Sequence, residues 1–197
     1  MSFQNRPDPS EQTSGRAARK VVAGYFLSLD GVAEAPDRFF TAWDDETDAH
    51  GAELIATQDA VVLGRRTYDE WAEFWPGSEI EPFASFINAV PKYVATSTPL
   101  AREWTGSHVI EGGLVGFVRH LKSRPGGDIG AHGSISVTRA LLAAGLADEL
   151  RLVVAPTIFA SGQRLFEGLP LIGLETIRST TSPSGHLLVD YRVVPRT

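Results

Sequence analysis

Cysteine is absent from this sequence of 197 residues. Its absence excludes disulfide bonds, thiolate nucleophiles, and zinc or iron–sulfur centres held by cysteine. A chain without cysteine also suits a reducing compartment, so we expect a cytoplasmic protein. Stability must then come from a packed core. The hydrophobic content of 43% and the charged content of 21% are ordinary for a globular domain.

An excess of basic charge is also lacking. The chain has 18 Lys and Arg residues against 24 Asp and Glu residues, a formal net charge of −6 at pH 7. Nucleic-acid binders usually carry a basic stripe that releases counterions from phosphates, so we expect no nucleic-acid partner. A small anionic ligand remains compatible with this balance, because local arginines can outweigh a distant acidic surface.

Long apolar runs are missing as well. No segment approaches the ~20 apolar residues that span a bilayer, and the N-terminus has no apolar signal-peptide core. We therefore expect no membrane partner. The five histidines show no metal-ligand spacing, which predicts that there is no metal site. Residues 1–19 are polar and contain Pro7, Pro9 and Gly15, which favours a flexible tail over the alternative of a dimer arm.

From Lys20 onward, β-type runs alternate with helical patterns, which predicts one α/β domain over residues 20–197. The expected strands are 20–29, 60–63, 93–97, 109–110, 128–131, 150–155, 176–181 and 187–194. The expected helices are 43–57, one that begins at 67, 79–89, 114–122 and 136–144. The turn at 182–185 predicts a closing hairpin. The pattern as a whole indicates a mainly parallel sheet, covered on both faces, with an antiparallel C-terminal hairpin.

The strand–turn–helix segment at residues 61–70 carries the clearest chemical signal. Its apolar strand ends at Gly64, and the spacing of Thr67 and Glu70 matches a capping box, which predicts a helix beginning at Thr67. Arg65 and Arg66 then lie in the turn, where two cations oppose the helix dipole unless an anion is bound. Two solvated arginines beside a well-capped helix remain the alternative interpretation.

Two further turns directly follow strands. Ser97 and Thr98 present hydroxyls that can donate to a phosphate or a ribose, although an ordinary hydroxyl-rich turn explains them equally well. Gly133 and Ser134 would bring backbone amides close to a pyrophosphate. The neighbouring His132 is typical of a structural loop histidine. This spacing differs from the G-x-G-x-x-G fingerprint of a Rossmann domain.

In this order the segments resemble the dihydrofolate reductase superfamily, and within it the RibD C-terminal reductase domain family with its small stand-alone bacterial members. The matching motifs are Ser28-Leu29-Asp30-Gly31, Leu63-Gly64-Arg65-Arg66-Thr67-Tyr68, His132-Gly133-Ser134, Gly145-Leu146-Ala147-Asp148-Glu149-Leu150, Ala155-Pro156 and Gly162-Gln163-Arg164-Leu165-Phe166. The resemblance covers roughly residues 20–195. It implies a three-layer α/β/α fold, NADPH as the cofactor, and a homodimer.

The resemblance also implies roles for individual residues. The cofactor would be held at three strand ends, by Gly64, Arg65, Arg66, Thr67, Ser97, Thr98, His132, Gly133, Ser134 and Ile135. The end of the first strand and its loop would approach the nicotinamide and the substrate through Ser28, Asp30 and Gly31.

The catalytic proton source is the least determined part of the site. The superfamily places a carboxylate on its first helix, and counting back from Gly64 without gaps leads to Asp48. Asp44, Asp45 and Glu46 lie close enough to compete, and Asp30 is a second candidate. Carboxylates at a helix start are also ordinary capping chemistry.

We therefore expect an NADPH-dependent reductase that transfers a hydride to a small heterocyclic or carbonyl-type substrate, similar to a riboflavin-pathway pyrimidine or a pterin. One alternative is a nucleotide-binding module of the same fold without turnover. Another is a dimeric interaction protein with a vestigial pocket, paired through the hairpin at residues 176–194.

Overall fold

The computed structural model describes residues 19–194. The tail predicted over residues 1–19 lies outside this range, except for its last residue. Arg19 is buried; its Nε donates to the carbonyl oxygen of Gly127 at 2.6 Å and its guanidinium pairs with Asp59. Arg19 therefore packs against the domain that follows it.

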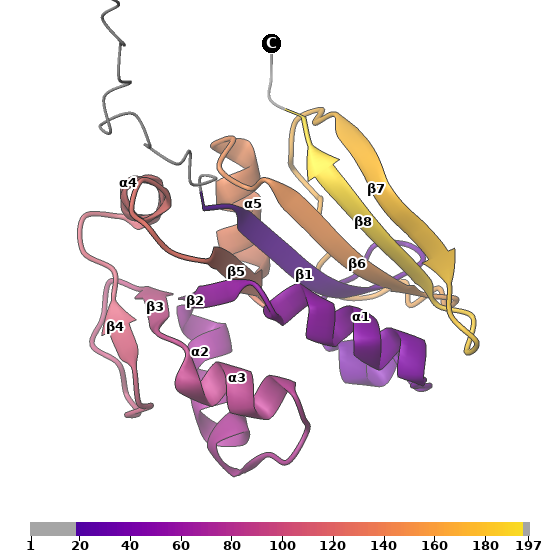
Figure 1. Ribbon diagram of the computed structural model, residues 1–197, viewed down its shortest axis with the longest axis horizontal. Helices are drawn as coiled ribbons and strands as arrows, with labels where there is room; N and C mark the ends of the chain where they lie inside the picture. The colour runs from indigo at the N-terminus through magenta and orange to yellow at the C-terminus, as the bar shows by residue number, and fades with distance from the viewer. Residues whose placement is uncertain (1–18, 195–197) are drawn as a thin grey trace, which may run out of the picture.

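The described residues form an eight-stranded sheet in the order β4-β3-β2-β5-β1-β6-β8-β7 (Figure 1). The strands are β1 (Val21–Ser28), β2 (Gln58–Gly64), β3 (Lys92–Ala95), β4 (Ser107–Val109), β5 (Asp128–His132), β6 (Glu149–Ala155), β7 (Leu174–Thr181) and β8 (Leu187–Val193). β1 to β6 pair in parallel, whereas β8 pairs antiparallel with both β6 and β7. The mainly parallel sheet and its closing antiparallel hairpin are thereby confirmed.

Within the described part of the chain, five α-helices cover the sheet in two layers. They are α1 (Asp45–Ile55), α2 (Arg65–Phe74), α3 (Phe83–Ala89), α4 (Leu114–Lys122) and α5 (Ile135–Ala143), and the short 3-10 helices η1 (Pro36–Arg38) and η2 (Trp75–Gly77) accompany them. α4 and α5 lie on one face of the sheet, and α1, α2 and α3 lie on the other (Figure 1).

The alternation of side chains along each strand explains the two layers. In β2, Ala60 and Val62 belong to the core under α4 and α5, whereas Val61 and Leu63 pack against α2 and α3. Because successive strand residues point to opposite faces, a strand buried on both sides needs apolar residues throughout. The continuous apolar run at this strand therefore encodes its central position in the sheet.

The predicted start of the second helix is wrong. α2 begins at Arg65 with Gly64 as its N-cap, two residues earlier than the capping box indicated. Thr67 does not cap the helix, because its hydroxyl donates to the carbonyl oxygen of Gly133 at 3.2 Å. Glu70 instead lies near Arg66, 3.9 Å from its Nε. A contact with a distant part of the chain thus replaces the local cap.

Candidate functional site

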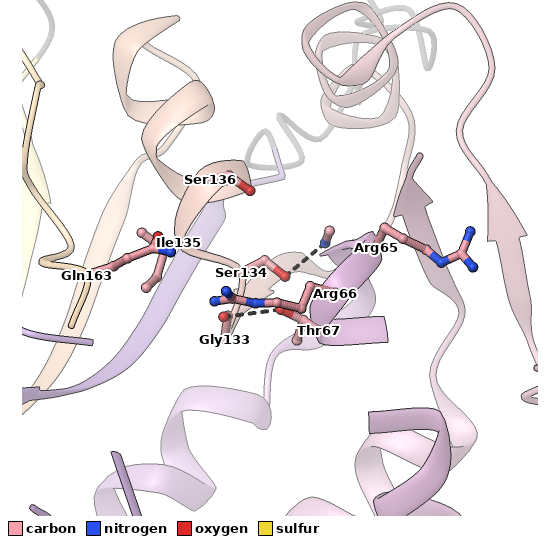
Figure 2. A pocket seen from close by; sticks show the side chains of 9 residues that line it. Arg65, Arg66, Thr67, Gly133, Ser134, Ile135, Ser136 and Gln163 are labelled. Carbon is pink, nitrogen blue, oxygen red and sulfur yellow. Dashed lines mark hydrogen bonds between the residues drawn. The ribbon is translucent and has the colours of Figure 1, made fainter. Parts of the chain in front are cut away.

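Two strand-to-helix turns meet at a pocket of about 250 Å³ (Figure 2). β2 and β5 are parallel neighbours in the sheet, so both strands end at the same edge. The helices that follow them, α2 and α5, begin side by side at that edge. The pocket is lined by Gly64, Arg65, Arg66, Thr67, Gly133, Ser134, Ile135, Ser136 and Gln163. Parallel α/β sheets generally bind ligands in this position.

Two hydroxyl groups link the turns to each other. Ser134 Oγ accepts a hydrogen bond from the backbone N–H of Gly64 at 2.8 Å, and the Thr67 hydroxyl donates to the Gly133 carbonyl (Figure 2). Gly133 has a φ of +63°, and a Cβ there would lie 2.8 Å from the ring of Trp71. Only glycine fits this turn, so the spacing between the two helix starts is firmly set.

The electrostatics of these two helix starts favour an anion. No acidic residue lies in the first turn of α2 or α5, and neither N-cap residue, Gly64 or Ser134, accepts a hydrogen bond from the first turn with its side chain. The first-turn N–H groups have no partner within their own helix, and each helix adds a partial positive charge. Two such ends at one pocket, together with an arginine, suit a phosphate.

The two arginines, treated alike in the sequence, have different surroundings. Arg65 donates to Asp69 Oδ2 at 2.7 Å and to Thr98 Oγ1 at 2.7 Å, and its side chain points away from the other pocket residues (Figure 2). Arg66 extends toward the β5–α5 turn, and its side chain is 60% exposed. Arg66 is therefore the guanidinium available to a ligand in the pocket.

The turn after β3 lies beside Arg65 rather than in the pocket. Thr98 and the carbonyl oxygen of Pro99 both accept hydrogen bonds from Arg65, and Ser97 is exposed. The Thr96 hydroxyl accepts from the backbone N–H of Thr98 at 3.2 Å, which shapes the turn. The structure thus places Ser97 and Thr98 beside Arg65, outside the residues that line the pocket.

His132 does not line the pocket, although it precedes Gly133. It is buried on the sheet face that carries α1 and α3, with its Nε2 2.7 Å from Gln58 Oε1. Gln58 donates its amide to the Leu54 carbonyl, which leaves its Oε1 to accept the proton on His132 Nε2. Burial lowers the pKa of His132 to about 4. The imidazole is neutral at pH 7, and its place supports a structural role.

The substrate-side residues predicted after β1 form a tight loop contact. The Ser28 hydroxyl donates to Asp30 Oδ1 at 2.8 Å, and the Asp30 carboxylate also accepts from the backbone N–H groups of Phe159 and Ala160. The Phe159 N–H and the Ser28 hydroxyl together lower the pKa of Asp30 to about 2. Asp30 is therefore ionised at neutral pH and has no proton to donate.

This contact joins residues 28–34 to residues 157–165, and we call the joined loops the loop clamp. Gly31, with a φ of +82°, accepts from Leu165 N–H at 2.9 Å through its carbonyl. Ala33 donates its N–H to the Gln163 carbonyl at 2.9 Å. The loop clamp contributes Gln163 to the lining of the pocket, whereas Ser28, Asp30 and Gly31 are not among the residues that line it.

The acidic residues at the start of α1 lie outside the pocket. Asp48 is exposed, and its backbone N–H donates to the Asp44 carbonyl within the helix. Asp44 caps α1 by accepting from Thr47 N–H at 2.8 Å, and it also accepts from Ser184. The Ser184 hydroxyl holds the pKa of Asp44 far below its usual range. The structure places neither carboxylate beside the residues that line the pocket.

Sequence reasoning missed three residues at the site. Ser136 and Gln163 line the pocket, and Glu34 contacts both Arg66 and the backbone of Gln163. Ser136 had a local signal, since it follows Ser134 at a helix start. Gln163 belongs to a recognised motif, but nothing in the sequence linked that motif to Glu34.

Residues 19–194 contain neither a membrane-spanning helix nor a metal-binding cluster. No helix in this range is both long enough and apolar enough to cross a membrane. No group of three or more histidine, aspartate or glutamate side chains in the same range is arranged to hold a metal ion.

Known proteins share this sequence pattern and this architecture. The sequence matches the model of the RibD C-terminal domain family over residues 19–188. The uncharacterized protein YyaP of Bacillus subtilis (strain 168) is 24% identical over 184 residues, which cover 91% of this chain and 97% of YyaP.

Solved structures extend the likeness. A pyrimidine reductase-like protein from Corynebacterium diphtheriae is 18% identical with a TM-score of 0.66, over 90% of this chain and 93% of that chain. Dihydrofolate reductase from Enterococcus faecalis, solved with NADP(H), is 16% identical with a TM-score of 0.60, over 88% and 96% of the two chains. The predicted dihydrofolate-reductase-like fold is thereby confirmed.

Proposed function

Since the chain belongs to the RibD C-terminal domain family, we propose that it is an NADPH-dependent reductase that transfers a hydride to a small heterocyclic or carbonyl-type substrate. One observation carries the proposal: two uncapped helix starts and Arg66 converge on one pocket of about 250 Å³. This arrangement suits the pyrophosphate of a dinucleotide.

The residues present fit the cofactor in two parts. Arg66, the first-turn N–H groups of α2 and the residues 133–136 would hold the pyrophosphate. Arg65, Ser97 and Thr98 would flank the adenosine half, because they lie together on the outer side of α2. When bound, NADPH would supply the hydride from its nicotinamide ring. The protein would supply the positioning and the electrostatic field.

The substrate would approach from the side of the loop clamp. Ser28, Asp30 and Gly31 hold the two loops of the clamp together through the contacts described above. A pyrimidine is the substrate class suggested by the likeness to the pyrimidine reductase-like protein, and a pterin is the class suggested by the likeness to dihydrofolate reductase. Asp48 remains our proposed proton donor, although its exposed position on α1 gives it no geometric support.

The absence, among the described residues, of a carboxyl group positioned to donate a proton favours a second function, which is binding without turnover. Asp30 is ionised and Asp48 lies outside the pocket, so a binding module without turnover fits the same geometry. Hydride transfer to a heterocycle needs a proton at the reacting centre, and binding alone does not.

One titration separates the two functions. The purified full chain is titrated with NADPH by calorimetry, and nicotinamide absorbance is then followed with a panel of pterins, pyrimidines and carbonyl compounds. Oxidation of NADPH with a panel member supports the reductase. Saturable binding without oxidation supports the module, and no binding of NADPH at all contradicts both.

We also propose that the protein forms a homodimer. β7 is an edge strand of eight residues, exposed along nearly its whole length, and it presents Leu174 and Ile177 to solvent. An open apolar edge strand favours pairing with another chain. Light scattering coupled to size exclusion tests this assignment, and a monomer mass at micromolar concentration would contradict it.

A further inference from the structure

Glu34 places a carboxylate at the mouth of a pocket built for anions. Its Oε1 lies 3.3 Å from Arg66 Nη1, and its Oε2 accepts from the backbone N–H of Gln163 at 3.0 Å. Its side chain is 33% exposed. Glu34 thus connects the loop after β1, the start of α2 and the loop after β6 at one point.

The charges around Arg66 make this contact unusual. None of the residues that line the pocket is acidic, and Arg65 is already held by Asp69 and Thr98. Arg66 is the guanidinium that a phosphate in the pocket would meet, yet Glu34 shares it. A carboxylate and a phosphate compete for the same N–H donors, because each anion can present two oxygens that accept hydrogen bonds from one guanidinium group.

We propose that Glu34 limits the affinity of the pocket for anionic ligands by holding the Arg66 guanidinium, so that a phosphate must displace the carboxylate before it pairs with Arg66. The inference rests on the proposed function for the ligand class, a dinucleotide phosphate. Glu34 thereby favours strongly charged ligands such as a pyrophosphate over singly charged carboxylates, since a weak anion gains too little to displace it.

The test uses inorganic pyrophosphate as the probe, titrated by calorimetry at low ionic strength. Glu34→Gln removes the charge and keeps a carbonyl oxygen to accept from Gln163 N–H. We expect the pyrophosphate Kd to fall about fivefold, because the ligand no longer has to break a partly exposed ion pair to reach Arg66. The matched control is Glu70→Gln, because Glu70 lies 3.9 Å from Arg66 Nε and is 66% exposed on the outer helix face. For this control we expect a change of less than about twofold.

A mutant cycle identifies the route of the effect. In an Arg66→Gln background the gain from Glu34→Gln should fall below about twofold, because the arginine that Glu34 occupies is gone. Glu34→Ala is the second variant, which removes the charge together with the Gln163 contact; it should shift the Kd in the same direction. Circular dichroism verifies that each variant is folded.

Several results would overturn the inference. They are an unchanged or raised Kd in both Glu34 variants, an equal gain in the Arg66→Gln background, or no pyrophosphate binding to any variant. The proposed function is judged separately by NADPH. Tighter pyrophosphate binding without NADPH binding upholds the role of Glu34 and contradicts the reductase, whereas NADPH turnover with an unchanged pyrophosphate Kd does the reverse.

Discussion

The bond from Gly64 N–H to Ser134 Oγ is the contact whose removal tests the site most directly. Ser134 is 3% exposed, and its hydroxyl is 2.8 Å from the Gly64 nitrogen. Ser134→Ala removes the acceptor and leaves a half-buried N–H group without a partner. Such a loss costs about 1–2 kcal/mol. For a domain of this size that corresponds to a fall in Tm of roughly 2–8 °C.

Ser136→Ala is the matched control, because Ser136 lines the same pocket but is exposed. Its removal should change the free energy of unfolding by less than about 0.5 kcal/mol. Urea denaturation measures both variants, and NADPH titration measures the second consequence. Ser134→Ala should weaken NADPH binding because the two helix starts lose their fixed spacing. Equal stability of the two variants would refute this account of the turns.

Four further predictions concern charge. Arg66→Ala should weaken NADPH binding by more than about tenfold. Arg65→Ala should weaken the binding of NADPH more than that of NADH, because Arg65 lies on the proposed adenosine side, where NADPH carries its extra phosphate. Calorimetry measures both affinities, and equal losses for the two cofactors would contradict that role. Asp30→Asn should lower stability at pH 7 and flatten its pH dependence. The pKa of Asp30 is lowered to about 2 in the fold, so its contribution is present above about pH 4 and is lost as the pH falls toward 2; urea denaturation across that range measures it, and parallel curves for the variant and the wild type would count against it. His132→Gln should reduce the loss of stability between about pH 6.5 and pH 4, because the pKa of His132 is lowered to about 4 and its neutral form must be protonated in acid; the free energy of unfolding against pH checks this, and an unchanged acid transition would argue against it.

Strand ends and their turn residues were predictable because their signals are local. Apolar runs followed by glycine or serine placed Gly64, Gly133 and Ser134 at the pocket from the sequence pattern alone. The resemblance supplied the cofactor, which no spacing of these residues reveals. Composition and periodicity were sufficient for the parallel sheet and the closing hairpin.

The start of α2 was not predictable, because the Thr67 side chain could form a hydrogen bond with either of two partners. One was its own helix, and the other was Gly133, 66 residues away along the chain. The predicted strand ended at residue 131, whereas β5 continues to His132. The alternation of side chains along β5 therefore buries His132, which the shorter predicted strand did not indicate. The contact between Glu34 and Gln163 spans 129 residues and has no local signature at all.

The position of β1 also shapes how this protein folds. Its two neighbours in the sheet are β5 and β6. Gly24 of β1 therefore cannot pair with either neighbour until His132 and Arg151 have been synthesised. Contacts between residues so far apart in the sequence slow folding, and they leave the apolar strand β1 unpaired while the chain is being made. The loop clamp closes later still, when residues 157–165 reach Asp30. A ligand that contacts Gln163 therefore binds only chains in which the clamp residues are present, and its binding would shift the newly made protein toward the folded state.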